Sequence, residues 1–121
     1  MANLKEALHR LSQIEGYIGS CVVDSNSGMM LGADGGGGVI NLEVAAAGNT
    51  EVVRAKRKTM SSLGLKDTIE DILITLGKQY HLIHPLAQHD ALFLYLVLDK
   101  ARANLAMGRH QLGAVARDLT F

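Results

Sequence analysis

The chain has 121 residues, which is room for one compact domain spanning residues 1–121 and too little for two. Hydrophobic residues make up 48% and there is one proline, so we expect an ordered globular protein and not a disordered one. The 12 lysines and arginines are balanced by 12 aspartates and glutamates, which argues against broad nucleic-acid binding and mildly favours a specific oligomer.

The expected compartment follows from cysteine usage and from the charges near the start of the chain. Cys21 is the only cysteine, which rules out an intramolecular disulfide, and Lys5, Glu6 and Arg10 stand where a signal peptide needs an apolar core. The longest apolar run, Ala91–Leu98, is far shorter than the ~20 residues of a membrane-spanning helix. We therefore expect a cytoplasmic protein with no membrane insertion.

The first half of the chain is predicted to form a helix and then a β-hairpin. Leucine and isoleucine recur three or four positions apart over 4–14, which is the spacing of one helix face. β-forming residues fill Tyr17–Val23, and Asp24–Gly28 supplies a turn before the short apolar run Met29–Leu31. The four glycines of Gly35–Gly38 predict a flexible loop.

The second half is predicted to contain a long helix, three strands and a final helix. Helical periodicity runs from Asn41, a good N-cap, to Gly64. Strand patterns follow at Asp67–Leu76, Gln79–Leu86 and Ala91–Leu98, and a helical stripe covers Ala103–Leu119. Because Ala91–Leu98 is apolar on both of its faces, it is predicted to be a central strand with helices above and below.

These elements predict an α+β fold with the order α-β-β-α-β-β-β-α. The short connections between strands make the five-stranded sheet antiparallel, unlike the parallel crossovers of dinucleotide-binding folds. We expect the first and last helices on one face of the sheet and the middle helix on the other, in three layers.

Nearly the whole chain resembles the roadblock family of dynein light chains and their bacterial relatives that regulate small GTPases. The resemblance is carried by Ile14–Tyr17, Cys21–Leu31, the alanine-rich start of the middle helix, Leu94–Asp99 and Ala103–Ala106. It implies a three-layer roadblock/profilin-like fold, a homodimer or paired heterodimer, and non-enzymatic binding of Ras-like small GTPases or motor subunits as a scaffold or regulator. The glycine run Gly35–Gly38 departs from the family and makes the link into the middle helix unusually mobile.

Sequence motifs for nucleotide and metal binding are incomplete. Gly35–Gly38 lacks the Gly-Lys-Ser/Thr of a phosphate-binding loop, so we interpret it as a hinge or tether. His81, His84 and His89 form the only histidine cluster, but the first two are an odd number of positions apart and point to opposite faces of a strand. Zinc would also need partners that Cys21 alone cannot supply. We expect no metal and no cofactor.

The sequence also offers no set of side chains typical of a catalytic site. Cys21 lies among apolar neighbours, where a thiol is usually a buried hydrophobe. Glu70 and Asp71 are adjacent in a predicted strand and so face opposite ways, which leaves no carboxylate pair for acid–base work. We expect no catalytic residues and no enzyme activity.

The densest charge in the chain is a basic cluster on the middle helix, Arg54, Lys56, Arg57 and Lys58. One interpretation places it near the helix C-terminus, where cations interact favourably with the helix dipole by ~0.3 to 1 kcal/mol each. The other makes Arg54, Arg57 and Lys58 a docking patch for an acidic partner surface. The glycine loop holds no arginine, so we expect action on a GTPase by positioning and not through an arginine finger.

The apolar stripe of the middle helix carries unusually small and polar residues, which a homodimer interface would explain. A nearby two-fold axis would let two backbones approach at the glycine and would give the asparagine a partner. The alternative is a tolerated glycine and an exposed asparagine. The predicted interface also includes the edge strand Asp67–Leu76 and comprises, on the helix, Ala45, Gly48, Asn49, Val52 and Lys56.

The favoured function is a non-enzymatic homodimeric interaction module that binds a Ras-like small GTPase or a motor-type partner. The alternative is a small-molecule sensor domain, because a sheet covered by helices can also hold a ligand in a cleft.

Overall fold

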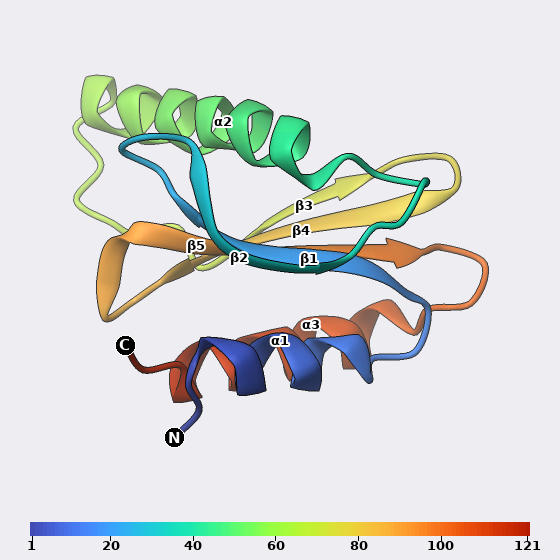
Figure 1. Cartoon of the computed structure of the whole chain (residues 1–121). Helices are drawn as coiled ribbons and strands as arrows, with labels where there is room; N and C mark the ends of the chain where they lie inside the picture. Colours follow the sequence, from blue (N-terminus) through green and yellow to red (C-terminus); the bar gives the residue numbers. More distant parts are fainter.

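The computed structural model describes residues 1–121, and its element order is the predicted one (Figure 1). The helices are α1 (Leu4–Ser12), α2 (Leu42–Ser62) and α3 (Leu105–Asp118). The strands are β1 (Tyr17–Asp24), β2 (Met29–Gly35), β3 (Ile72–Thr75), β4 (Gln79–Leu86) and β5 (His89–Asp99). None of the three helices has the length and apolar character needed to cross a membrane.

The five strands form one antiparallel sheet in the order β2-β1-β5-β4-β3. β5 lies in the centre, as its two apolar faces predict. Its even-numbered leucines join the core cluster beneath α1 and α3, and its odd-numbered residues Phe93, Tyr95 and Val97 join the cluster beneath α2. The strict alternation explains why both faces of β5 had to be covered.

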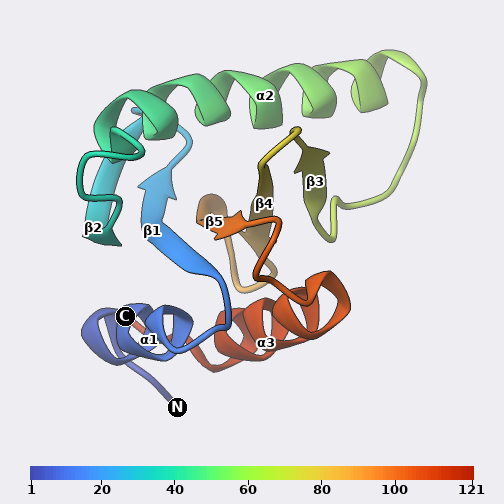
Figure 2. The ribbon, with the colours of Figure 1, turned by 90° about the vertical axis from the view of Figure 1, so that its right-hand side faces the viewer.

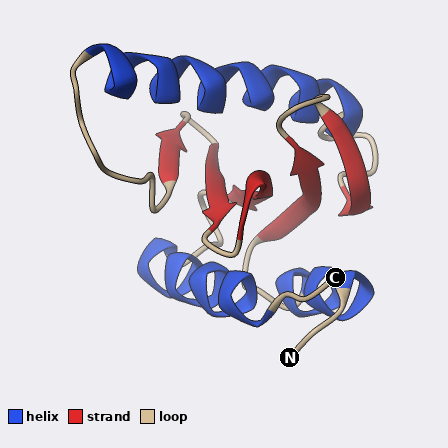
Figure 3. Ribbon diagram, turned by 90° about the vertical axis from the view of Figure 1, so that its left-hand side faces the viewer, coloured by secondary structure: helices blue, strands red, loops and turns tan.

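The three predicted layers are confirmed by views from the two sides of the molecule (Figures 2 and 3). α2 lies alone on one face of the sheet, and α1 and α3 lie together on the other. Each helix begins at an asparagine whose side chain accepts a hydrogen bond from the backbone N–H three residues later: Asn3, Asn41 and Asn104. The two ends of the chain meet beside α1 and α3, where Ala2 pairs with Leu119.

The third strand is shorter than predicted, and Pro85 explains the difference. Asp67–Leu76 was the expected strand, but pairing with β4 begins only at Ile72. The N–H of Leu76 donates to the carbonyl of Gln79 (2.9 Å), so Gln79 directs its backbone groups toward β3. The direction of these groups alternates along a strand, so Pro85, six residues later, also faces β3. Because proline has no N–H, the ladder cannot continue past Ile72 on that side.

The glycine run is also less mobile than predicted. Gly35 is the last residue of β2, and Gly36 is buried with its N–H bonded to the carbonyl of Ile18 (2.8 Å). Gly36 has φ +84°, and a Cβ there would lie 2.9 Å from the carbonyl oxygen of Ile40. The first two glycines therefore permit a tight turn into α2, and the hinge interpretation is wrong for them.

Candidate functional site

The predicted interface residues of α2 lie along the side of the helix that faces β3. Gly48, Val52 and Lys56 are exposed, whereas Ala45 and Asn49 are half-buried. A Cβ built at Gly48 would meet nothing within 4 Å, so this glycine is not required by packing inside the chain. Val44, one turn before Gly48, has 67% of its surface exposed. The stripe thus carries apolar and small residues that nothing in the chain covers.

Asn49 lies beside a buried tyrosine within the chain, which the sequence did not reveal. Its side chain is close enough to the Tyr95 hydroxyl to oppose the burial that raises the pKa of Tyr95 to about 12. The Tyr95 hydroxyl is hydrogen-bonded to Nδ1 of His81 (2.9 Å), and Nε2 of His81 to Oε1 of Gln79 (2.8 Å). A chain of hydrogen bonds therefore runs from Tyr95 of β5 to the start of β4, and Asn49 of α2 borders it.

The edge strand β3 lies beside this stripe. Ile72 packs against the core beneath α2, and Leu73 packs against the core on the other face. A groove of about 490 Å³ is lined by Val52, Lys56 and Met60 of α2 and by residues 65 and 67–72. Leu76, just past the strand, has 43% of its surface exposed. The open stripe of α2 and the free edge of the sheet form one continuous surface, which we call the α2–β3 face.

The basic cluster does not lie at the end of its helix. α2 continues to Ser62, so no basic residue occupies its last turn. The favourable interaction with the helix dipole is confined to that turn, so the interpretation through the dipole is wrong. Arg54, Lys56 and Lys58 are exposed. Arg57 is half-buried, and its guanidinium donates to the backbone carbonyl of Asp90 at the start of β5 (2.9 Å). Arg57 is thus held against the sheet and is less free to meet a partner than its neighbours are.

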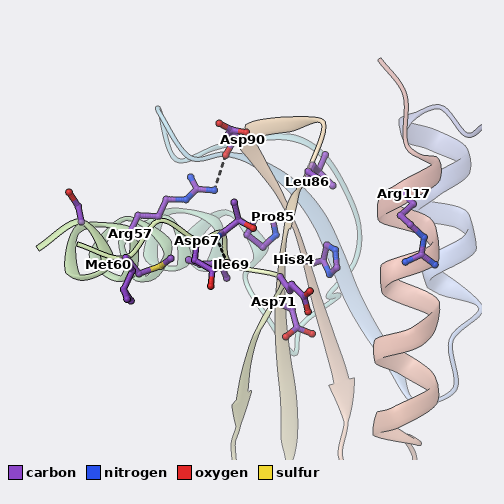
Figure 4. A pocket seen from close by; sticks show the side chains of 15 residues that line it. Arg57, Met60, Asp67, Ile69, Asp71, His84, Pro85, Leu86, Asp90 and Arg117 are labelled. Atoms are coloured by element: carbon purple, nitrogen blue, oxygen red, sulfur yellow. Dashed lines mark hydrogen bonds between the residues drawn. The ribbon is translucent and has the colours of Figure 1, made fainter. Parts of the chain in front are cut away.

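A cleft of about 860 Å³ lies between the segment that precedes β3 and the end of β4 (Figure 4). The end of α2 and residues 65 and 67–71 form one wall. The other comes from His84–Ala87 and from Asp90 at the start of β5, and Arg117 of α3 closes one end. The cleft exists because Pro85 ends the pairing of β3 with β4. Sequence analysis missed it, although a proline in a strand predicted to have two neighbours was the available signal.

Acidic groups predominate in the cleft. Its carboxylates are Asp67, Glu70, Asp71 and Asp90, against the guanidinium groups of Arg57 and Arg117. The guanidinium of Arg109 in α3 donates two hydrogen bonds, of 2.8 and 3.0 Å, to the carboxylate of Asp71. Burial lowers the pKa of His84, although Asp71 and Glu70 act against that effect, so the imidazole is neutral at neutral pH.

The structure separates the remaining reactive side chains. His81 contacts Tyr95 on the α2 face, whereas His84 lies near Gly113 of α3, which confirms that the two histidines point to opposite faces. No three His, Cys, Asp or Glu side chains come together as a possible set of metal ligands. Cys21 is buried, and burial raises the pKa of its thiol to about 12, so it carries no activated thiolate.

The element order, the three layers and the sheet order define a Roadblock/LC7-type fold, which confirms the resemblance drawn from the sequence at the level of the fold. No protein-family model and no curated protein matches the sequence, so the similarity to known proteins is carried by structure.

Particular solved structures superpose over nearly the whole chain at low sequence identity. Myxococcus xanthus MglB matches with a TM-score of 0.78 and 15% identity, covering 91% of this chain and 85% of that one. A Roadblock/LC7 domain from Streptomyces avermitilis matches with a TM-score of 0.79 and 10% identity, covering 97% and 94%. MglB in a tetrameric arrangement matches with a TM-score of 0.79 and 16% identity, covering 95% and 83%.

Proposed function

We propose that this chain is a non-enzymatic homodimeric module that binds a Ras-like small GTPase or a motor-type partner and regulates or scaffolds it. The observation that carries the proposal is the α2–β3 face, where an uncovered stripe of small and apolar residues adjoins a free sheet edge. The Roadblock/LC7-type fold supports it, as does the similarity to an MglB structure described as tetrameric. An unpaired strand edge either meets a partner or risks aggregation.

The backbone of β3 restricts how two copies can pair. Leu76 bonds to Gln79 of β4, so by alternation Leu73 and Thr75 direct their N–H and C=O groups outward. When two copies pair antiparallel around a two-fold axis, the residues that exchange backbone hydrogen bonds must therefore be odd-numbered in both copies. The possible registers differ by steps of two residues.

One register suits the side chains better than its neighbours. With Leu73 opposite the partner's Thr75, Ile74 meets its own copy on the axis, Ile72 lies opposite the partner's Leu76, and Glu70 lies opposite the partner's Lys78. Apolar side chains then pair under the two copies of α2, and opposite charges meet at the ends. A shift of two residues in one direction places Leu76 opposite the partner's Glu70. The same shift in the other direction places Ile72 opposite the partner's Lys78. Both shifts bury a charge against an apolar side chain.

The helix contributes to the same interface through Ala45, Gly48, Asn49, Val52 and Lys56. Gly48 allows close approach of a second helix, and Val52 supplies apolar surface that is 37% exposed in the single chain. Asn49 acts differently from its predicted role, since it supports Tyr95 from within and borders the interface.

A cysteine scan tests the dimer and its register together. Ile74→Cys should give an intermolecular disulfide on mild oxidation, because residues opposite each other in a non-hydrogen-bonded pair bring their Cβ atoms close. Thr75→Cys should not cross-link to its own copy, and Cys21 is buried and cannot compete. If Thr75→Cys or Leu73→Cys cross-links instead, the register is wrong.

Sedimentation tests the dimer without any cross-link. The chain should sediment at twice its 13.0 kDa mass at micromolar concentration. Gly48→Arg should convert it to a monomer, because the arginine has open space in the single chain and would collide with a second helix. Met29→Arg, on the exposed opposite edge of the sheet, is the matched control and should remain a dimer. A monomeric wild type would reject the proposal.

The partner-binding part of the proposal assigns docking to Arg54, Arg57 and Lys58. Their replacement by alanine should weaken binding of a Ras-like GTPase recovered with this chain and should reduce the salt dependence of that binding, while stimulated hydrolysis at saturating protein persists. Arg57→Ala alone should have the smallest effect, because its guanidinium is bonded to Asp90. A loss of turnover of ~1000-fold with unchanged affinity would identify an arginine finger and contradict action by positioning.

The cleft favours one second candidate, a sensor of small molecules. Its volume of about 860 Å³ lies within the range of ligand pockets, roughly 300 to 1,000 Å³. Native mass spectrometry of the purified protein tests this candidate, because a retained ligand would add a fixed mass. A clean mass that stays unchanged after incubation with cell extract would reject it.

A further inference from the structure

The segment Lys66–Asp71, which we call the strap, is an extended length of chain with free backbone groups. None of its N–H or C=O groups bonds to another backbone group, and its one backbone contact is the N–H of Thr68 donating to Oδ1 of Asp67 (2.8 Å). The strap leads directly into β3, so its conformation continues a strand that has lost its neighbour. Free groups in an extended segment are what an added strand requires.

The opposite wall of the cleft, at the end of β4, also has backbone groups without a strand partner on the side that faces the strap. The last residues of β4 to pair with β3 are Tyr80–Ile83, and beyond them Pro85 presents a carbonyl without a compensating N–H. The cleft therefore separates two lengths of chain that would be sheet neighbours in an unbroken ladder. Between them lie apolar side chains, among them Met60, Leu65, Ile69 and Leu86.

The charges of the cleft select the kind of side chain that can enter. Only two ion pairs form in the chain, Arg10 with Asp118 and Arg109 with Asp71, so the carboxylates of Asp67, Glu70 and Asp90 are unpaired. Arg57 is committed to the carbonyl of Asp90. Arg57 keeps its positive charge in that bond, so Arg57 and Arg117, the latter at one end, are two cations against the three free carboxylates (Figure 4). The cleft as a whole favours lysine or arginine over acidic side chains.

We propose that this cleft binds an extended basic peptide segment of a partner protein, which adds to the strap as a strand. Backbone hydrogen bonds to the strap hold the peptide, its lysines or arginines meet the free carboxylates, and the alternate side chains enter the apolar part of the cleft. In the dimer proposed above, Glu70 faces the partner's Lys78, so there the peptide relies on Asp67 and Asp90. The site extends the proposed function with a second binding surface.

Fluorescence anisotropy at low ionic strength tests the proposal with a defined probe. The probe is a labelled six-residue peptide of alternating lysine and valine with blocked ends. The wild-type chain should bind it, and a peptide with glutamate in place of lysine should not bind. Asp67→Asn with Asp90→Asn should weaken binding by about tenfold, because each removes one charged partner and keeps the backbone contacts. Glu43→Gln with Glu51→Gln, two exposed changes on α2, is the matched control and should leave binding within about twofold.

N-methylation of alternate peptide bonds distinguishes strand addition from attraction between charges. The methylated lysine–valine peptide keeps its charge and loses its donors, so its affinity should fall at least about tenfold. Equal binding of the methylated peptide would overturn strand addition. Equal weakening by the control pair, or no binding at millimolar peptide, would overturn the site itself. Sedimentation of the Asp67→Asn, Asp90→Asn variant should still give the wild-type mass, which separates failure of this site from failure of the dimer.

Discussion

The two faces of the sheet are covered in different ways. On one face, α1 and α3 enclose a core of 14 buried residues, and the two chain ends join beside them. On the other face, α2 alone packs on the sheet in a core of nine buried residues and leaves one side open toward β3. The second face has an uncovered apolar stripe beside a free sheet edge, and the cleft at that edge reaches Arg117 of α3 on the first face.

Stability and the proposed recognition are divided between the layers. Burial of apolar surface is the main driving force of folding, so the α1–α3 face carries more of the stability. A helix that covers a sheet alone cannot seal both of its sides, and what it leaves open is available to a second molecule.

Truncating a core leucine on the α1–α3 face should cause the largest loss of stability. Leu96 is fully buried in the centre of β5, so Leu96→Ala should lower the free energy of unfolding by ~2 to 5 kcal/mol in urea denaturation. Val53→Ala, also fully buried but beneath α2, removes fewer methyl groups and should cost less. A greater loss for Val53→Ala would contradict the division between the faces.

The turn into α2 should respond strongly at one glycine and hardly at the next. Gly36→Ala places a Cβ at positive φ and 2.9 Å from a carbonyl oxygen, so it should lower the free energy of unfolding by at least ~1 to 2 kcal/mol. Gly37→Ala meets nothing within 4 Å and has no positive φ, and thermal denaturation should show little change or a slight gain. Equal effects at the two sites would restore the hinge interpretation.

The ion pair that ties the strap to α3 should contribute modestly. Asp71→Asn weakens its two bonds to Arg109 and should lower the free energy of unfolding by up to ~1 kcal/mol, as for other partly exposed pairs. A double-mutant cycle with Arg109→Gln isolates the interaction of the two side chains. A coupling energy near zero would mean that the strap is positioned by other contacts.

Acidification should weaken the fold gradually through one histidine on each face. Burial lowers the pKa values of His81 and His84 below the 6.5 of an unfolded histidine, so the unfolded chain binds more protons between the two values. Stability should therefore be full above about pH 6.5 and fall as the pH decreases below it. Urea titrations at several pH values should give a shallower slope for His81→Gln and for His84→Gln. The exposed His110→Gln is the control and should keep the wild-type slope.

The sequence was informative where a pattern is local. Alternation along Ala91–Leu98 predicted the central strand and its two faces, and Asn41 as an N-cap predicted where the middle helix begins. It failed where a contact joins distant residues. The start of β3 is decided by Pro85 on another strand, Asn49 lies beside Tyr95 of β5, and Arg57 is held by the carbonyl of Asp90 at the start of β5. No periodicity in α2 or in the strap contains that information.

The strand order also dictates how the chain must fold. β1 with β2, and β3 with β4 and β5, are hairpins whose partners are close in sequence, so each group can form early. The pairing of β1 with β5 joins residues about 70 positions apart, and the entropy of closing that loop must be met before the sheet is complete. We expect the β1–β5 seam to be the slow step of folding. Substitutions there should slow refolding, whereas substitutions in α2 or β3 should mainly hasten unfolding.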